Sequence, residues 1–305
     1  MRLRLTRLDV WLLLMTFFWG SNFSVVKVAL TELPGPVFNG IRMALACLLF
    51  VALIAWREGV KASLESVDPR DWLTLLWLSF IGHGLYQVFF LSGVARTSVS
   101  NSALIVGCTP ITVSLLSAWL GHERPGLARW AGTAVSFAGI CLVVGHGVRA
   151  GTSTLTGDGL MVLAMIGWSI YTVGMAPLLA RYSPLFITGL TMTLGTIMYL
   201  PFALCWLKEA NLSRVSPGGW AGIVYSAAFS LVAAYVIWYT AVQRLGSGRT
   251  AIYSNVIPLV AMLVAAVVVH EVLTVEKLIG ALAVLCGVLL TKLDPGHGPA
   301  VRRPA

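Results

Sequence analysis

Polar side chains that could bind a solute stand inside long apolar stretches of this sequence. His83, Tyr86, Gln87 and Phe90 are spaced at i, i+3, i+4 and i+7, which places them on one face of a helix. An amide inside hydrocarbon needs a hydrogen-bond partner, so Gln87 and Asn255 are predicted to face the interior of a helix bundle. Tyr and Trp also anchor helices at membrane interfaces, which is the alternative for any one of them. The predicted binding residues are Trp19, Asn22, His83, Tyr86, Gln87, Trp168, Tyr171, Tyr235, Trp238, Tyr239 and Asn255.

Two basic residues, Lys27 and Arg42, also lie inside apolar stretches, where an ionisable group is costly and becomes a candidate for function. One interpretation is structural: the side chains reach lipid headgroups, or cap helix carbonyls across the turn from Pro34 to Pro36. The other is a positive field near the outer mouth of a pathway, which favours an anionic group such as a substrate carboxylate. The sequence leaves both interpretations open.

Acidic residues avoid the middle of the apolar stretches. Glu32, Glu123, Asp158 and Glu271 all fall near the ends, and His83 is the titratable residue nearest a middle. We therefore expect a solute to exit or exchange without an ion gradient, or else proton coupling through His83, whose charge changes near neutral pH. Glu123 and Glu271 end matching stretches, where they either gate a pathway or pair with basic residues.

Pro110 and Pro258 lie about half-way along two apolar stretches. A proline removes a backbone donor and frees a carbonyl of the preceding turn, which is tolerated where a helix lines a cavity. Paired helix breaks in corresponding stretches are a sequence indication of a transport site. The alternative is a static kink that serves packing.

These residues must be positioned by membrane-spanning helices. The chain has 305 residues, of which 58% are hydrophobic and 11% charged, and its mean hydropathy is +0.86. This composition excludes both an ordinary soluble enzyme and a disordered chain. A spanning helix needs about 20 apolar residues. Stretches of this kind occur at 9–31, 36–56, 71–94, 98–120, 127–146, 158–180, 184–206, 218–243, 249–269 and 275–292.

The orientation follows from the basic residues of alternate loops. With ten spans, one side of the membrane holds fourteen Lys and Arg, including those of both termini, and the other side holds five. The sequence therefore predicts that both termini lie in the cytoplasm and that the loop at 147–157 lies outside.

A shift of 148 residues brings many positions into register without a gap. The matched pairs include Pro36 with Pro184, Trp72 with Trp220, Pro110 with Pro258, Glu123 with Glu271, and Gly139 with Gly287. We interpret 1–148 and 149–296 as two repeats, followed by a cytoplasmic tail at 297–305. Each repeat holds five spans, an odd number, so the second must enter the membrane from the opposite side. The predicted fold is an all-α integral membrane protein of ten transmembrane helices in two inverted five-helix repeats around a central cavity, as in many secondary transporters.

Several segments of the sequence form a set that is known from one protein family. They are Phe18 to Phe23, Lys27, Pro34 to Pro36, Arg42, the segment from Ala103 through Pro110 to Pro125, Gly132 and Gly139, and the second copy at Pro258, Glu271, Gly280 and Gly287. This set resembles EamA-type transporters of the drug/metabolite transporter superfamily, over nearly the whole chain in two EamA-like halves. The resemblance implies ten helices in a basket around a cavity, and export of amino acids or other small metabolites across a bacterial inner membrane. It does not choose the substrate.

Other classes of protein fit less well. An intramembrane enzyme needs a nucleophile with its base, a metal set or paired acids, and the sequence has no HExxH, GxSxG or Walker A motif. A flippase of lipid-linked substrates remains an alternative. We predict a small-molecule substrate, the lipid bilayer as surroundings, a monomer or homodimer, no cofactor, no metal and no nucleic-acid partner, because the basic residues are dispersed.

Overall fold

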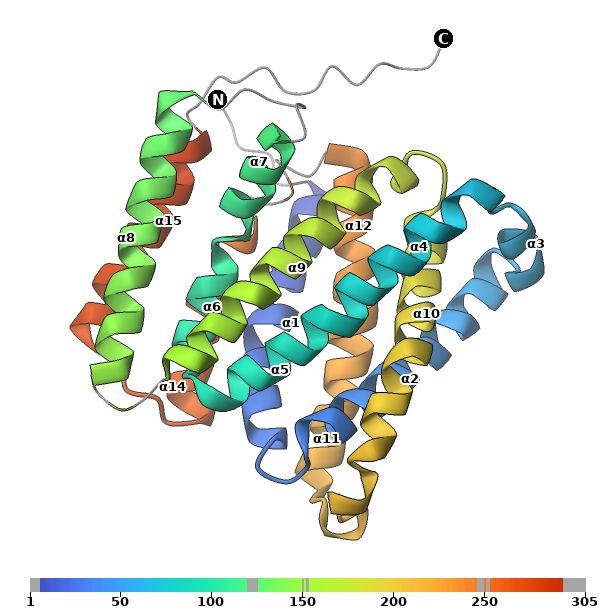
Figure 1. The fold of residues 1–305 in the computed structure, drawn as a ribbon, viewed down its shortest axis with the longest axis horizontal. Helices are drawn as coiled ribbons and strands as arrows, with labels where there is room; N and C mark the ends of the chain where they lie inside the picture. Colours follow the sequence, from blue (N-terminus) through green and yellow to red (C-terminus); the bar gives the residue numbers. More distant parts are fainter. Residues whose placement is uncertain are drawn as a thin grey trace.

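The computed structural model describes residues 6–119, 126–149, 151, 154–245, 250 and 253–292, which form helices and turns without a strand (Figure 1). Six helical segments are long and apolar enough to cross a membrane: Arg7–Ala29, Gly35–Arg57, Pro69–Arg96, Leu155–Leu179, Pro184–Cys205 and Pro217–Leu245. They agree with six of the predicted spans. The other four coincide with helices whose apolar part is shorter or interrupted, so the count of ten stays a prediction.

The order of the elements follows the predicted pattern. The first part of the chain forms α1 (Arg7–Ala29), α2 (Gly35–Arg57), α3 (Val60–Glu65), η1 (Pro69–Asp71), α4 (Trp72–Ser79), η2 (Phe80–Leu85), α5 (Tyr86–Arg96), α6 (Val99–Gly107), α7 (Thr109–Trp119) and α8 (Leu127–Arg149). The second part forms α9 (Leu155–Leu179), α10 (Pro184–Cys205), η3 (Leu207–Glu209), η4 (Leu212–Arg214), α11 (Pro217–Tyr225), η5 (Ser226–Ala233), α12 (Ala234–Leu245), α14 (Ile257–Val268) and α15 (Val275–Lys292).

Local sequence fixes where these helices begin. The side chains of Thr6, Thr154, Ser183 and Ser216 accept a hydrogen bond from the first turn of α1, α9, α10 and α11. Such caps satisfy backbone donors that have no partner within the helix. Proline stands in the first turn of α2, α10 and α11, where its missing N–H costs nothing.

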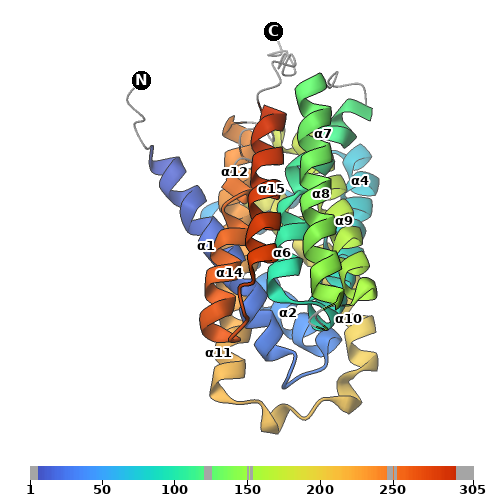
Figure 2. The same cartoon turned by 90° about the vertical axis from the view of Figure 1, so that its left-hand side faces the viewer.

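Helices that are related by the 148-residue offset pack in equivalent ways. α8 lies along α15 (Figure 2) and α2 along α10, while α1 packs on α14 and α9 packs on α6 and α7. Ser136 Oγ donates to the carbonyl oxygen of Val284 at 3.1 Å, and these two residues are 148 positions apart. Gly139 lets α8 and α15 approach closely there, because a Cβ at this position would lie only 2.9 Å from the Gly280 carbonyl oxygen.

Two interruptions of the helices also occur at equivalent places. The rod from α4 to α5 contains a π-helical segment, η2, and the rod from α11 to α12 contains another, η5. Shifted by 148 residues, η2 falls at 228–233, inside η5. π-Helical turns change the direction in which side chains point and are frequent at functional sites. The sequence analysis did not predict them.

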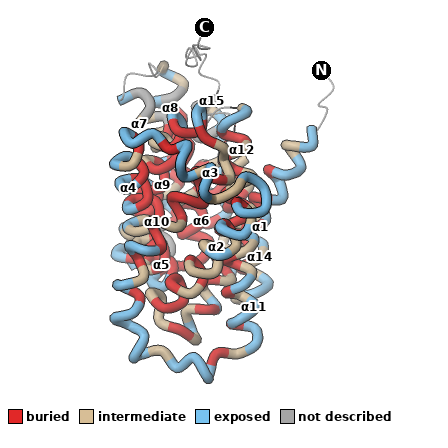
Figure 3. Tube along the Cα trace, turned by 90° about the vertical axis from the view of Figure 1, so that its right-hand side faces the viewer, coloured by how far each residue is buried: buried red, intermediate tan, exposed pale blue. Residues whose placement is uncertain are grey.

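The surface of the bundle is apolar and the interior is mixed. Buried residues line the inner sides of the helices, and exposed residues follow their outer sides (Figure 3). Large apolar side chains are widely exposed, among them Trp56 (75%) and Leu73 (78%). Exposed apolar area on this scale indicates a surface that faces lipid.

Candidate substrate-binding site

A cavity lies among α1, α2, α5, α9, η5 and α12. It also borders the junction between α6 and α7 and the start of α14. Its empty volume is about 620 Å³, part of which is open to solvent. Eight predicted binding or charged residues line it: Trp19, Asn22, Arg42, Tyr86, Gln87, Trp168, Tyr235 and Trp238. The sequence spacing therefore brings together side chains from both halves of the chain.

Aromatic rings form most of the wall. Among the rings of Trp19, Trp168, Tyr235 and Trp238, five pairs of centroids lie 5.2 to 6.3 Å apart, in tilted and edge-to-face arrangements. Trp19 is oriented by its indole N–H, which donates to the Ser230 carbonyl oxygen at 3.0 Å. Ser230 belongs to η5, so the π-helical segment positions part of the wall. Rings that support one another in this way give a rigid apolar surface.

Arg42 brings a positive charge to this cavity. Its side chain is 1% exposed and joins three helical rods. Nε donates to Asn39 Oδ1 at 2.7 Å, one terminal nitrogen to Ser226 Oγ at 2.8 Å and the other to Gln87 Oε1 at 2.6 Å. The guanidinium carbon also lies 5.4 Å from the centre of the Phe38 ring. All of these partners are neutral, and the buried side chain does not reach the surface of the bundle.

Three polar atoms of lining residues are buried without a hydrogen-bond partner among the described residues. They are Asn22 Oδ1, Tyr235 Oη and Trp238 Nε1. A buried donor or acceptor left unpaired costs about 1–3 kcal/mol. Asn22 Oδ1 can accept a hydrogen bond, the other two atoms can donate one, and Arg42 adds a positive charge. Such groups can bind a polar molecule.

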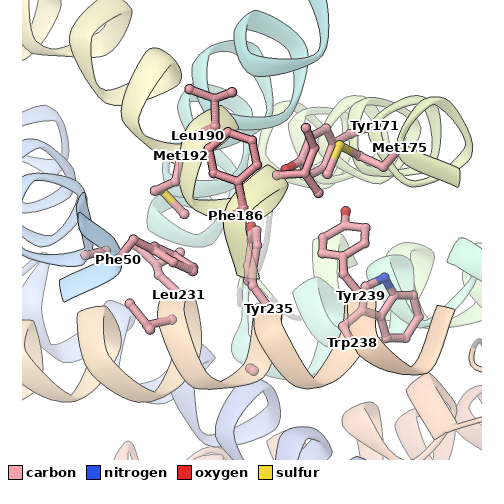
Figure 4. Packing of buried hydrophobic residues seen from close by; sticks show 14 of the residues in the cluster. Phe50, Tyr171, Met175, Phe186, Leu190, Met192, Leu231, Tyr235, Trp238 and Tyr239 are labelled. Atoms are coloured by element: carbon pink, nitrogen blue, oxygen red, sulfur yellow. The ribbon is translucent and has the colours of Figure 1, made fainter. Parts of the chain in front are cut away.

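Four predicted residues lie outside the lining. His83 is fully buried in η2, where its Nε2 lies 3.1 Å from Tyr171 Oη, and Tyr171 Oη lies 2.7 Å from Thr191 Oγ1. Gly195 makes room for the histidine, because a Cβ there would lie 2.3 Å from His83 Cβ. Tyr239 packs behind the wall, with its ring 5.7 Å from that of Tyr171 (Figure 4). Asn255 is also buried, and its Oδ1 has no partner among the described residues.

Lys27 caps the C-terminal end of α5. Its Nζ donates to the carbonyl oxygens of Val94 at 2.7 Å, Ala95 at 3.3 Å and Thr97 at 2.7 Å. These are carbonyls of the last turn of α5, which lack partners within the helix. Helix capping, one of the two interpretations of the sequence, is therefore present, but it acts on α5 and not across the turn between α1 and α2.

Glu271 caps the N-terminal end of α6. Its carboxylate accepts the backbone N–H groups of Val99 at 3.0 Å and Ser100 at 3.3 Å, and lies 2.8 Å from Lys277 Nζ. Burial raises the pKa of Glu271, but the hydrogen bonds and charge of Lys277 and the bonds from Ser100 outweigh it and hold the pKa below the ordinary value. The matching Glu123 lies outside the described residues, so gating by this pair stays a prediction.

The helix breaks predicted at Pro110 and Pro258 lie next to the cavity. α6 ends at Gly107 and α7 begins at Thr109, so Pro110 stands in the first turn of a new helix, and Pro258 stands likewise in α14. The two junctions touch, since a Cβ on Gly107 would lie 2.6 Å from Pro258 Cγ. Val106, Thr109, Ser254 and Ile257 line the cavity from these junctions.

Several residues of the site were missed by the sequence analysis. Asn39 and Ser226 hold Arg42, and neither stood out because Asn and Ser are common in helices. The spacing Asn39 to Arg42, three residues apart on one helix face, was a usable signal. No group of three His, Cys, Asp or Glu side chains that could hold a metal ion occurs in the part of the chain that the structure describes.

Comparisons with known proteins identify the family. The sequence profile of the EamA-like transporter family matches residues 6–145 and 155–293. An "Uncharacterized transporter" of Archaeoglobus fulgidus is 30% identical over 275 residues, which cover 90% of this chain and 93% of the relative. The "Uncharacterized transporter YetK" of Bacillus subtilis is 27% identical over 288 residues, covering 92% and 86%. A solved crystal structure shares the fold, with a TM-score of 0.66 at 18% identity over 92% of this chain and 96% of that chain.

Proposed function

Since the chain belongs to the EamA-like transporter family, we propose that it is a secondary transporter that exports small metabolites carrying a carboxylate, such as amino acids, through the central cavity. The observation that supports this proposal is the guanidinium of Arg42, which is buried at an aromatic cavity and whose hydrogen-bond partners among the described residues are neutral. A buried charge is costly unless it is paired. A substrate carboxylate supplies the missing negative charge.

The other residues that line the cavity can contact the ammonium group and the apolar part of an amino acid. An ion pair at 4 Å is worth about 4 kcal/mol at an effective dielectric constant of about 20, which is enough to orient a solute by its carboxylate. Asn22 Oδ1 can accept a bond from an ammonium group, and the rings of Trp19, Trp168 and Trp238 accommodate an apolar body. Binding is therefore expected to require the carboxylate and to tolerate variation in the apolar part.

The same proposal includes how the protein lies in the membrane. We place it in a bacterial inner membrane with ten spans, two inverted repeats and both termini in the cytoplasm. The basic residues of alternate loops favour this orientation, and the equivalent packing of helices 148 residues apart favours the repeat. A reporter that is active only in the periplasm, fused to the C-terminus, is expected to give no signal. A strong signal would contradict the orientation.

The transport function is tested with purified protein in liposomes that are loaded with radiolabelled amino acids. Wild-type protein is expected to release at least one of them, and Arg42→Gln to slow that release more than tenfold. Arg57→Gln is the matched control, because Arg57 lies on the same helix with its side chain stacked on exposed Trp56, away from the cavity. Movement of a fluorescent lipid-linked sugar without release of any amino acid would instead identify a flippase and contradict the proposal.

A further inference from the structure

A second cavity opens on the flank of the bundle, apart from the proposed transport site. It is bounded by the turn between α1 and α2, by α5 and by the end of α10, and its empty volume of about 800 Å³ includes open space at the mouth. A cavity of this size can hold a drug-sized molecule. None of its lining residues belongs to the lining of the transport site, so a molecule bound here is separate from a solute bound there.

This cavity exists because α5 leaves α10 after the π-helical segment η2. Within η2 the two rods touch, since a Cβ on Gly195 of α10 would lie 2.3 Å from His83 Cβ. Beyond η2, α5 packs along α9 instead (Figure 1), where a Cβ on Gly93 would lie 2.6 Å from Met161 Sδ. Because glycines allow both close contacts, the gap between the ends of α5 and α10 is built into the fold.

The walls and the surroundings of this cavity are apolar. The ring of Tyr199 packs edge-to-face on that of Phe202 at 5.6 Å, and Leu91 of α5 lines the same space. Ile197, Phe202 and Leu204 of α10 are exposed, as expected of a surface that faces lipid. Water finds few hydrogen-bond partners in such a cavity, whereas an acyl chain from the surrounding lipid can fill it.

Arg96, the last residue of α5, adds a positive charge to the lining. Its side chain is exposed, and one terminal nitrogen donates to the Ser92 carbonyl oxygen at 2.9 Å. No carboxylate pairs with Arg96 in the part of the chain that the structure describes, and the other lining residues carry no charge. A guanidinium has five N–H donors, so those that remain can bind two oxygens of a phosphate group.

Trp206, which follows the last residue of α10, also lines the cavity. Tryptophan is enriched where the acyl chains of a membrane meet the headgroups. Arg96 and Trp206 each stand at the end of a helix, whereas Leu91 and Tyr199 lie further inside α5 and α10. The cavity therefore offers a charged group at the level of a lipid headgroup and apolar walls at the level of its chains.

We infer that this cavity is a binding site for an anionic phospholipid, whose phosphate group binds Arg96 while one acyl chain lies against Leu91, Tyr199 and Phe202. The single positive charge of the lining selects a headgroup with a net negative charge, because a zwitterionic headgroup also carries a cation. The bound lipid is a resident of the protein and not its cargo. It fills the gap beside the turn between α1 and α2.

Native mass spectrometry of the full chain tests the headgroup contact. The probes are dioleoylphosphatidylglycerol and dioleoylphosphatidylcholine, which share their chains and differ in charge. Wild-type protein is expected to bind the anionic lipid about tenfold more tightly, since bonds between charged groups are the strong ones. Arg96→Gln is expected to lose this preference. Arg214→Gln, an exposed arginine in the connection from α10 to α11, is the matched control and is expected to keep it.

A preference that persists in Arg96→Gln would overturn the assignment. Competition by glycerol 3-phosphate is the second arm, and it is expected to leave the lipid bound because the soluble compound has no acyl chain. Displacement of the lipid by this compound would show a site for soluble anions and contradict the inference.

Ala95→Trp tests the place of the acyl chain. Ala95 is exposed and lines the cavity, so the larger side chain can enter the open space without displacing a neighbour. It is expected to weaken binding of the anionic lipid about tenfold, because the chain loses its apolar contacts. Ala52→Trp, at an exposed alanine of α2 outside the cavity lining, is the control and is expected to bind as wild-type protein does. Unchanged binding in Ala95→Trp would place the lipid outside the cavity.

A last measurement distinguishes a resident lipid from cargo. Fluorescent phosphatidylglycerol in one leaflet of liposomes that contain the protein is expected to cross no faster than in liposomes without protein. Faster crossing would show that the lipid is transported and would contradict the inference. Release of labelled amino acids tests the proposed function separately, since the lipid site and the transport site share no residue.

Discussion

Lys27 and Arg42 are basic residues in adjacent helices, and the structure gives them opposite surroundings. The Lys27 ammonium group has three N–H donors, and three carbonyl oxygens at the end of α5 receive them. The Arg42 guanidinium has five N–H donors, and three neutral side chains receive three of them at the cavity. Lys27 is half-buried, and its donors are all used by backbone carbonyls, so it stabilises a helix end. Arg42 is buried beside a cavity and has further donors that can bind a solute.

The comparison extends to the regions in which these residues lie. At the helix ends, Glu271 and Glu32 complete the first turns of α6 and α11. At the cavity, polar atoms of Asn22, Tyr235 and Trp238 have no partner in the part of the chain that the structure describes. An unpaired buried polar group destabilises a fold, so each one that lines the cavity is a candidate for binding a solute. The contrast between the two regions is not complete, because Ser100 Oγ, Asn101 Oδ1 and Asp158 Oδ2 near the start of α6 also have no partner among the described residues.

The largest expected effect separates Arg42 from Lys27. Arg42→Met is expected to lower substrate affinity by about 2–5 kcal/mol, since it removes one partner of a buried ion pair. Lys27→Met is expected to leave the affinity unchanged and to destabilise the protein by about 1–3 kcal/mol, because carbonyls of α5 lose their donor. Substrate binding to detergent-solubilised protein and thermal unfolding measure the two quantities. Equal effects of both variants on affinity would remove the distinction.

A second prediction concerns the aromatic wall. Trp168→Ala and Trp238→Ala are each expected to weaken substrate binding by about 1–3 kcal/mol, because a large side chain loses its contact area with the solute. Trp77→Ala is the control, since Trp77 is 58% exposed on the outer side of the bundle. Transport rates measured at several substrate concentrations separate affinity from expression. An unchanged affinity in both cavity variants would mean that the wall does not touch the substrate.

The sequence was sufficient for the features that depend on pattern. Apolar stretches predicted helices, and the spacing of Tyr86 with Gln87 and of Tyr235 with Trp238 predicted the helix faces that meet at the cavity. Pro110 and Pro258 marked the junctions, because a proline without its N–H begins a helix more easily than it continues one. These are local properties of a chain, which a single sequence displays directly.

The sequence was not sufficient for features that depend on three-dimensional partners. It could not decide between the two interpretations of Arg42, since Ser226 lies 184 positions away. It placed Asp158 correctly at a helix end but did not show that the end is buried against α6. The π-helical segments η2 and η5 have no proline or charge to mark them, and they depend on packing of the whole bundle.

A third prediction tests the helix ends through pH. The bonds to Glu271 hold its pKa below the ordinary value of 4.5, so ionised Glu271 stabilises the fold above that value. This contribution is lost as the pH falls through the lowered pKa of the folded protein. Glu271→Gln is therefore expected to unfold at a lower temperature than wild-type protein at neutral pH, with a difference that shrinks below about pH 4. A difference that is constant with pH would show that the charge of Glu271 has no part in stability.

The smallest effect is expected for a single unpaired atom. Tyr235→Phe removes the hydroxyl group, whose Oη has no partner within the described ranges, and keeps the ring in the wall. If this hydroxyl donates to the substrate, affinity falls by about 0.5–1.5 kcal/mol, the usual net value of one hydrogen bond. Since no protein group loses a partner, thermal stability is expected to stay the same or to rise. Tyr225→Phe is the control, because the Tyr225 hydroxyl lies 2.6 Å from Ser21 Oγ away from the cavity lining, so its removal costs stability and not affinity. Lower stability with unchanged affinity in Tyr235→Phe would place this atom with the structural groups of the helix ends and not with the binding groups of the cavity.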